Sequence, residues 1–210
     1  MVWLLVLIGI AVIVYFVNRK PATQEDPVET TRTKLSILPE QFVVLDLETT
    51  GLDPFKHEII EIAAIRINRD STQHHTLQAF VKPSKKVPKK ITGLTGITQE
   101  MVDAEGEELA SVMKQFAEFF GDCRLVTFNA EFDMAFLQQA ASRTGISLPN
   151  PVSCALQMSR SAWPNRKSYR LADLARDGGL SKDGTHRALD DAQRAAIVYT
   201  SAVAKLGEIR

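Results

Sequence analysis

Two carboxylates lie one residue apart at the end of an apolar run: Asp46 and Glu48 follow Phe42–Leu45. A β-strand directs residues i and i+2 to the same face, so both side chains are predicted to leave an otherwise hydrophobic strand together. Buried negative charges repel each other unless a positive group lies between them, and a hard divalent cation bound through oxygen atoms meets that need. For an isolated Asp-x-Glu, the ordinary alternative is a strand end that emerges into solvent.

Two further segments place acidic residues at the starts of predicted helices. Asp133 falls in the first turn of a helix that is expected after a short strand. His186 precedes a long Ala-rich helix whose first turn carries Asp190 and Asp191. The three segments together supply carboxylates and one histidine but no thiol, a donor set that suits Mg²⁺ or Mn²⁺ better than structural zinc.

In order, spacing and flanking residues, these segments resemble the three motifs of the DEDDh group of 3′→5′ exonucleases, which contains the proofreading epsilon subunit of bacterial DNA polymerase III. Asp46–Gly51 is similar to the family's Asp-x-Glu-Thr-Thr-Gly, Asn129–Asp133 to Asn-Ala-x-Phe-Asp, and His186–Asp191 to His-x-Ala-x-x-Asp. The resemblance spans about residues 40–203, most of the chain. Three motifs in order are far more specific than any one of them.

The resemblance implies a ribonuclease H-like fold and five catalytic residues: Asp46, Glu48, Asp133, Asp191 and His186. The four carboxylates are the expected ligands of two Mg²⁺ or Mn²⁺ ions, which would stabilise the attacking and leaving oxygens of an in-line phosphoryl displacement. Asp46 is expected to bridge both ions, with Glu48 and Asp191 completing one site and Asp133 with substrate phosphate completing the other. A histidine can take a proton from the attacking water near neutral pH, which is the role expected of His186. The product would be a nucleoside 5′-monophosphate.

Two positions near these motifs need separate interpretation. Phe128 stands where the family often has histidine, and its apolar side chain fits simple strand packing. The family spacing from His186 selects Asp191 as the ligand. Asp190 is therefore expected to be solvated or to interact with the helix dipole.

Two turns are expected to hold the terminal nucleotide. The family uses the turn after its first motif in this way, which carries the role to Thr49, Thr50 and Leu52. Residues 91–98 resemble a second family segment that lies against the terminal bases, and Ile91 and Leu94 are its expected apolar contacts. Apolar side chains on base faces bind without reading sequence. The lysines just upstream are candidates for backbone contacts, although such a loop is more often simply solvated: Lys82, Lys85, Lys86, Lys89 and Lys90.

The composition predicts one ordinary catalytic domain. The chain has 210 residues, of which 45% are hydrophobic and 24% charged, as in a typical globular domain. The formal net charge of zero argues against a protein that coats nucleic acid and favours one that grips a few nucleotides at a strand end. Cys123 and Cys154 lie in apolar contexts, which favours buried free thiols in a reducing compartment.

The first 17 residues carry no charged side chain and are predicted to form a transmembrane anchor. As a helix they would be about 25 Å long, slightly shorter than the hydrocarbon core, and Arg19 and Lys20 could snorkel to close the gap. A cleaved secretory signal is the alternative, but the run lacks a positive n-region and a small-x-small cleavage site. Because the cations follow the span, the positive-inside rule predicts a single-pass protein of the cell inner membrane whose catalytic domain faces the cytoplasm.

The expected domain organisation is an anchor over 1–17, a flexible polar linker over 18–39 and an exonuclease domain over 40–205. Apolar periodicity predicts strands at 42–47, 58–67, 74–82 and 124–128, and helices at 107–120, 131–143, 153–161, 170–177 and 187–205. Three strands in series, followed by alternating helix and strand, predict an α/β domain with a mixed β-sheet flanked by helices.

The function expected from these observations is a metal-dependent 3′→5′ exonuclease acting at the 3′ ends of nucleic acid, foremost single-stranded DNA, in repair, recombination or turnover. RNA 3′-end trimming is the first alternative, because contacts to the sugar 2′ position are not visible in the sequence. A polymerase proofreading subunit fits less well, since such a subunit is expected to extend further at its carboxyl terminus. A catalytically silent binding module is disfavoured by the complete set of five catalytic side chains.

Overall fold

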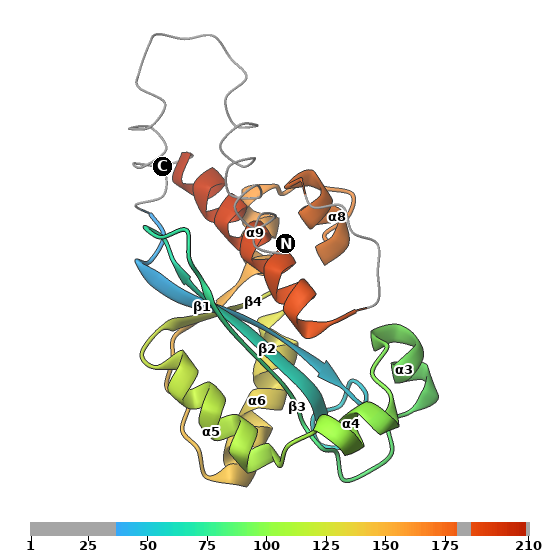
Figure 1. Ribbon diagram of the computed structural model, residues 1–210. Coiled ribbons are helices and arrows are strands. Elements are labelled where there is room, and N and C mark those ends of the chain that lie inside the picture. Colours follow the sequence, from blue (N-terminus) through green and yellow to red (C-terminus); the bar gives the residue numbers. More distant parts are fainter. Residues whose placement is uncertain (1–36, 180–185, 209–210) are drawn as a thin grey trace, which may run out of the picture.

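The computed structural model describes residues 37–179 and 186–208 of the chain. Within these residues five strands form one sheet in the order β3-β2-β1-β4-β5 (Figure 1). The strands are β1 Gln41–Thr49, β2 Ile59–Asn68, β3 His75–Phe80, β4 Arg124–Thr127 and β5 Val152–Cys154. β1, β2 and β3 are antiparallel neighbours, whereas β4 and β5 continue the sheet parallel to β1. The predicted mixed sheet is confirmed.

Helices cover both faces of this sheet (Figure 1). Their bounds are α3 Lys89–Thr95, α4 Gln99–Glu105, α5 Leu109–Phe120, α6 Ala130–Thr144, α7 Ala155–Ala162, α8 Leu171–Asp177 and α9 Ala188–Glu208. The long helix α9 crosses one face and packs against β1, β2, α7 and α8. α5 and α6 pack on the other face, so the domain has three layers.

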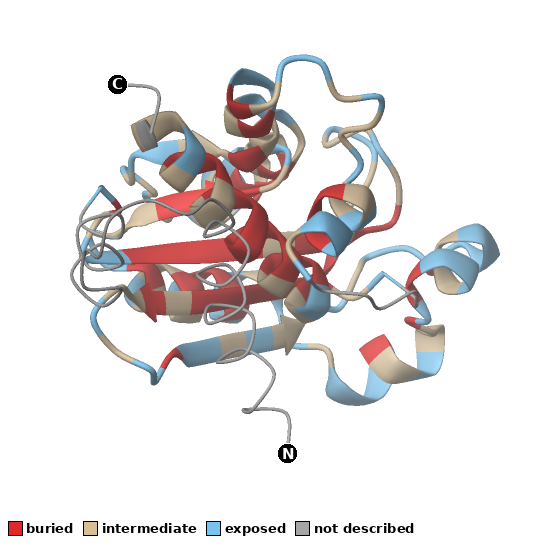
Figure 2. Cartoon of the chain, turned by 90° about the horizontal axis from the view of Figure 1, so that it is seen from above, coloured by how far each residue is buried: buried red, intermediate tan, exposed pale blue. Residues whose placement is uncertain are grey.

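The alternating side chains of β1 contribute to two hydrophobic cores. Phe42 and Val44 pack toward α9, while Val43, Leu45 and Leu47 pack toward α5 and α6. Figure 2 shows the buried residues concentrated in the central strands and in the helix faces that lie against them. α9 meets the sheet through a run of small buried side chains: Ala188, Ala192, Ala195 and Ala196. Because alanine adds little bulk, the helix axis can approach the strands closely at the end where β1 carries its carboxylates.

Most predicted elements are found within two residues of their expected bounds, but three elements were missed. Val152–Cys154 pairs with β4 as β5, so the helix expected over 153–161 begins only at Ala155. α3 and α4 form in a segment that contains Gly93 and several Thr residues, which have weak helix propensity. The side chain of Thr98 caps α4 by accepting a hydrogen bond from the amide of Met101, a local signal that apolar periodicity does not detect.

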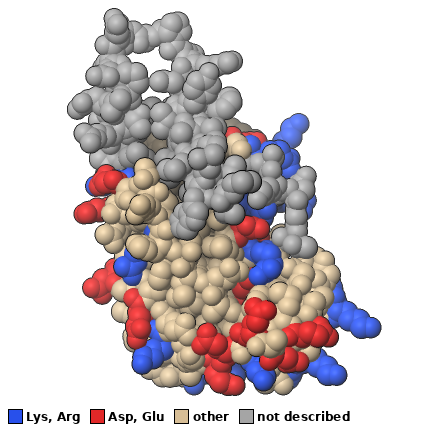
Figure 3. Space-filling view, in the orientation of Figure 1, with Lys and Arg blue, Asp and Glu red and all other residues tan. Residues whose placement is uncertain are grey.

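The predicted anchor over 1–17 and nearly all of the predicted linker lie outside the described residues. Among the residues that are described, no helix is both long enough and apolar enough to cross a bilayer. Cys123 and Cys154 are free and half-buried, and Cys123 packs against the core between the sheet and α5 and α6. Lys, Arg, Asp and Glu side chains are intermixed over the face seen in Figure 3, as expected for a chain of zero net charge.

Candidate active site

β1 carries two carboxylates on the face that α9 covers. Phe42 and Val44 pack in the α9 core, and the strand's alternation places Asp46 and Glu48 on the same face. Both side chains are half-buried, whereas Leu47 between them is buried in the opposite core. The antiparallel register with β2 shifts between Glu48 and Thr49, so regular pairing is interrupted directly after the second carboxylate.

The third carboxylate enters from the junction between β4 and α6. Asp133 lies in the first turn of α6 and is buried. Its Oδ2 accepts a hydrogen bond from the hydroxyl of Thr127, the last residue of β4. Because β4 runs parallel to β1, the carboxyl ends of both strands lie at the same end of the sheet. Asp133, which follows β4, is therefore on the same side of the molecule as the carboxylates of β1.

The fourth carboxylate and the histidine come from the start of α9. Asp191 is buried in the first turn of the helix, and its Oδ2 lies 2.9 Å from Nδ1 of His186. Arg194, one turn further along, donates to the other oxygen of the same carboxylate. The side chain of His186 is 66% exposed, and its backbone amide donates to the carbonyl of Leu94 at 3.1 Å. The imidazole therefore stands at the solvent side of the carboxylates.

Three of these residues have the arrangement of a metal site. One donor atom each from Glu48, His186 and Asp191 lies within 4.8 Å of the others. The remaining two carboxylates are close enough to interact electrostatically, because the charges of Asp133, Asp191 and Glu48 all act on Asp46. The five residues expected from the sequence motifs are thus brought together from three distant segments of the chain.

The cluster holds more negative charge than its surroundings compensate. Burial, together with the charges of Asp133 and Asp191, raises the pKa of Asp46 well above its ordinary value. Burial and the charge of Asp191 raise the pKa of Glu48 to about 8. Burial raises the pKa of Asp133 to about 7 although Thr127 donates to it. Without a cation these carboxyl groups resist ionisation. A bound divalent cation would stabilise their charged, carboxylate form.

The turn after β1 is held by its own side chains. The hydroxyl of Thr49 donates to the carbonyl of Gly51 at 2.6 Å, and the hydroxyl of Thr50 accepts from the amide of Glu58 at 3.0 Å. A Cβ at position 51 would lie 2.5 Å from the ring of His57, so a larger residue than Gly51 would displace that ring. Both Thr side chains therefore shape the turn from inside, and their hydroxyls are engaged within it.

Apolar side chains project from this turn and from α3. Leu52 is 83% exposed and Phe55 is 81% exposed on the turn, and Leu94 is 47% exposed on α3. Ile91 is half-buried against the small core beneath α3. The backbone contact between Leu94 and His186 brings α3 beside the start of α9. The sequence analysis did not single out Phe55, although an aromatic residue in a polar turn was a visible signal.

Three further features near the motifs were interpreted from the sequence: Phe128, Asp190 and the lysines upstream of residue 91. Phe128 is half-buried and packs against the core beneath α9, as expected for strand packing. Asp190 is exposed in the first turn of α9, in agreement with a solvated residue. All the upstream lysines are exposed: Lys82, Lys85, Lys86, Lys89 and Lys90.

Residues that support the cluster were missed by the sequence analysis. Thr127 and Arg194 each bond a carboxylate of the cluster, and Arg194 stands three residues after Asp191 on the same helix. Glu61 is a fully buried carboxylate on β2 that pairs with Arg187. A glutamate within a run of Ile and Ala, and an arginine directly after the motif histidine, were the signals that could have drawn attention to each residue separately.

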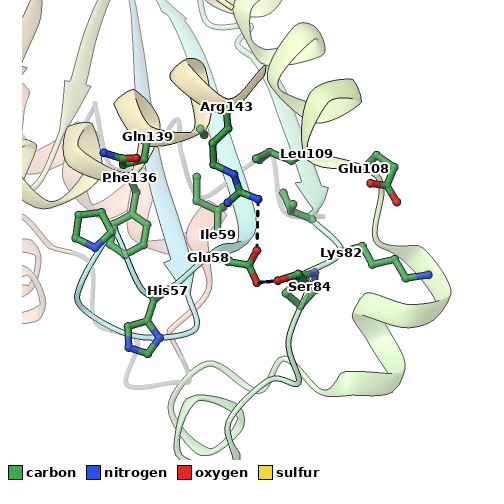
Figure 4. A pocket seen from close by; sticks show the side chains of 14 residues that line it. His57, Glu58, Ile59, Lys82, Ser84, Glu108, Leu109, Phe136, Gln139 and Arg143 are labelled. Carbon is green, nitrogen blue, oxygen red and sulfur yellow. Dashed lines mark hydrogen bonds and ion pairs between the residues drawn. The ribbon is translucent and has the colours of Figure 1, made fainter. Parts of the chain in front are cut away.

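A pocket of about 280 Å³ lies elsewhere, beside α5 and α6 (Figure 4). At its wall Glu58 pairs with Arg143 at 3.7 Å and accepts from the amide and hydroxyl of Ser84, each at 2.9 Å. His57, Phe136 and Gln139 also line it. None of the five clustered residues does, so this pocket is separate from the carboxylate cluster.

Comparison of the sequence with known proteins identifies a family over most of the chain. Residues 43–199 match the protein family RNase_T, described as Exonuclease. The DNA polymerase III subunit epsilon of Aquifex aeolicus is 33% identical over 172 residues, a match that covers 81% of this chain and 84% of the relative. A DNA polymerase III PolC-type of Clostridium perfringens is 36% identical over 169 residues, covering 80% of this chain but only 12% of that protein.

The fold is also shared with a solved nuclease. The zinc-bound form of the Escherichia coli ExoI complex with single-stranded DNA superposes with a TM-score of 0.68 at 20% identity. The match covers 82% of this chain and 42% of that chain. At this level of identity the likeness establishes the ribonuclease H-like exonuclease fold that the sequence motifs predicted.

Proposed function

Because the chain belongs to the exonuclease family and carries its domain over residues 43–199, we propose that it is a two-metal 3′→5′ exonuclease that releases nucleoside 5′-monophosphates. One observation carries this proposal. Four carboxylates from β1, α6 and α9, and one histidine from the segment just before α9, meet at one end of the sheet. A purely structural role would not require so many acidic groups to be buried together, since each costs desolvation free energy.

The residues present fit a pair of hard divalent cations. Glu48 and Asp191, with donor atoms already close together, would hold one ion. Asp46 and Asp133 would complete the binding of the second, with Asp46 shared between the two. Bound Mg²⁺ or Mn²⁺ would stabilise the charge that develops on the attacking and leaving oxygens.

His186 is assigned as the general base. Its Nδ1 faces the carboxylate of Asp191, so a proton on Nδ1 would be donated to that oxygen and Nε2 would keep its lone pair. The exposed imidazole can reach a water molecule above the cluster, take its proton during attack on the terminal phosphodiester, and release that proton to solvent.

Single-stranded DNA is the proposed substrate. The E. coli ExoI structure was solved with single-stranded DNA, and the exposed Leu52, Phe55 and Leu94 offer apolar contacts to unpaired bases. These contacts do not read sequence. RNA with a free 3′ end is the alternative substrate, because none of the residues of the described site is assigned a contact with the sugar 2′ position.

Proofreading for a DNA polymerase is a second candidate, favoured by the names of the relatives. The chain spans only about an eighth of the PolC-type proteins, so their polymerase activity is not carried over to it. A preference for mismatched primer ends over matched ends would support a proofreading role. Equal rates on both would favour a self-sufficient nuclease.

The direct test uses the full chain with Mg²⁺ and matched 3′-labelled and 5′-labelled substrates: single-stranded DNA, duplex DNA and RNA. We expect stepwise loss of mononucleotides from the 3′ end, fastest on single-stranded DNA, and none in EDTA. Release of nucleotides from the 5′ end, or internal cleavage, would contradict the proposal.

We also propose that residues 1–17 anchor the protein in the cell inner membrane with the catalytic domain on the cytoplasmic side. The support is the uncharged run itself and the cations Arg19 and Lys20 that follow it. Membrane fractionation of the full chain against a variant lacking residues 1–35 tests the anchor. Protease added to intact cells tests the orientation, because it should leave the domain undigested.

A further inference from the structure

A fully buried carboxylate in the middle of β2 has no part in the proposed chemistry. Glu61 is 0% exposed and lies directly opposite Glu48 in the antiparallel register of β1 and β2. Residues opposite each other in a sheet point to the same face, so the side chain of Glu61 lies on the α9 side, next to the catalytic cluster. Burying a charge here is costly unless it is fully paired.

Every partner of Glu61 comes from a neighbouring element. Gln78 on β3 donates from Nε2 to Oε1 at 2.7 Å. Arg187 donates from Nη2 at 2.7 Å and from Nε at 3.2 Å. The backbone amide of Ala188, the first residue of α9, donates to Oε2 at 3.0 Å. Glu61 thus provides, from another strand, the acceptor that a capping side chain ordinarily supplies at a helix start.

The bonds of Glu61 fix the two residues that directly follow His186. The imidazole of His186 is mostly exposed and contributes little packing of its own, so its position depends on the backbone on which it stands. Asp191 follows Ala188 by three residues on the same helix, so the same anchor sets the depth of that carboxylate. The guanidinium of Arg187 also lies over the ring of Phe80, 5.4 Å from its centroid, which restricts its rotation.

The pair also limits the negative charge of the site. The negative charge of Glu61 raises the pKa of Glu48, whereas the positive charge of Arg187 lowers it. Arg187 therefore offsets the effect of Glu61 on the cluster. A neutral residue in place of Arg187 would therefore leave one more uncompensated carboxylate next to the cluster.

We propose that the Glu61–Arg187 ion pair clamps the start of α9 onto β2 and thereby positions His186 beside the carboxylate cluster. Glu61 and Arg187 are positioning residues, since neither is assigned a contact with substrate. The inference rests on the proposed role of His186 as general base.

The kinetic test compares Glu61→Gln and Arg187→Ala with Glu58→Gln in the full chain. Glu58 directly precedes β2 and is also paired with an arginine, but its partners lie on α6 and the loop after β3. Glu61→Gln and Arg187→Ala should each lower kcat by about 10–100-fold, as is usual for residues that orient a reacting group, with KM within about threefold of wild type. The double variant should be no slower than the slower single variant. The side chain of Arg187 is partly exposed, so Arg187→Ala is the variant more certain to fold. A wild-type kcat in this variant would overturn the proposal.

The second measurement observes His186 directly. The chain has four histidines, so a ¹H–¹³C spectrum of protein labelled at histidine Cε1 shows four imidazole signals, and His186→Ala identifies the one from His186. In Glu61→Gln and Arg187→Ala the His186 signal should shift while the other three stay in place. An unmoved His186 signal would refute the clamp even if activity falls. A shifted signal together with full activity of His186→Ala would instead refute the general-base role and leave the clamp supported.

Discussion

The two faces of β1 are stabilised in different ways. On one face Val43, Leu45 and Leu47 are buried among side chains of α5 and α6, and hydrophobic burial alone stabilises them. On the other face the same apolar alternation ends in Asp46 and Glu48, whose burial raises their pKa. The first face contributes to stability without a ligand. The second buries carboxylates at a cost in stability, which the proposed cations would offset. Substitutions one residue apart should therefore have opposite consequences.

The largest expected effect on activity is that of Asp46→Ala. Losing a ligand removes several kcal/mol of transition-state stabilisation, so kcat should fall by about 10³-fold or more. In EDTA the variant should unfold at a temperature equal to or above wild type, because a repelling carboxylate has gone. Thermal unfolding and 3′-end release assays, with Mg²⁺ and without, measure both quantities.

Leu45→Ala is the matched control on the opposite face. Leu45 is fully buried, and its truncation should cost about 2–5 kcal/mol of unfolding free energy. The fraction that remains folded should keep its specific activity. If Leu45→Ala lost activity per folded molecule as Asp46→Ala does, the two faces would not be separable.

The next effect in size concerns the base. His186→Ala should lower kcat by about 10²–10⁴-fold with little change in KM, since the imidazole is mostly exposed and is assigned to proton transfer. Higher pH should partly restore the rate, because hydroxide attacks without a base. A loss of binding as large as the loss of turnover would make His186 a substrate contact.

The motifs predicted the clustered residues because each one lies at the end of an element whose periodicity is plain. Asp46 and Glu48 end an apolar strand, and Asp133 and Asp191 lie in first helical turns. The mixed sheet was predicted from the three strands in series and the strand–helix alternation after them, but the order of its strands was not predicted. The assignment of catalytic roles to these residues stays a prediction that the variants above test.

What could not be predicted depends on contacts between distant segments. Glu61 disturbed the alternation of its strand, but its partner Arg187 is 126 residues away, and no local pattern links them. β5 is only three residues long and forms because Leu125, Val126 and Thr127 offer an open edge for pairing. α3 depends on packing over a small core that includes Ile60 and Ile97, which compensates for its weak helix propensity.

A smaller effect is expected in the pH dependence of stability in the absence of metal. Burial first, and then neighbouring negative charge, raises the pKa of Glu48 from 4.5 to about 8, and burial raises that of Asp133 from 3.8 to about 7. The folded state therefore binds protons more tightly than the unfolded state, and in EDTA stability should fall as pH rises from about 5 to 8. Each pKa unit corresponds to about 1.4 kcal/mol, and each kcal/mol to about 2–4 °C at this chain length.

Saturating Mg²⁺ should reduce this fall, because the cation favours the ionised carboxylates. Asp46→Asn should flatten the profile in EDTA, since one of the interacting charges is absent. If the unfolding temperature in EDTA rose over the same pH range, burial of Asp46 and Glu48 would not be destabilising.

The smallest effect is expected at the rim of the site, where Leu52 is 83% exposed. Leu52→Ala leaves the turn intact, because Thr49, Thr50 and Gly51 hold it through their own contacts. The unfolding temperature should stay within about 1 °C, since surface substitutions change stability by about 0.5 kcal/mol or less. KM for single-stranded DNA should rise about three- to tenfold through the lost apolar contact with a base, of about 1 kcal/mol. Val152→Ala, an exposed apolar residue on β5 away from the cluster, is the control and should leave KM unchanged. Equal KM in the two variants would show that the turn after β1 does not hold the terminal nucleotide. The function of the α9 side of β1 would then rest on the carboxylates and His186 alone.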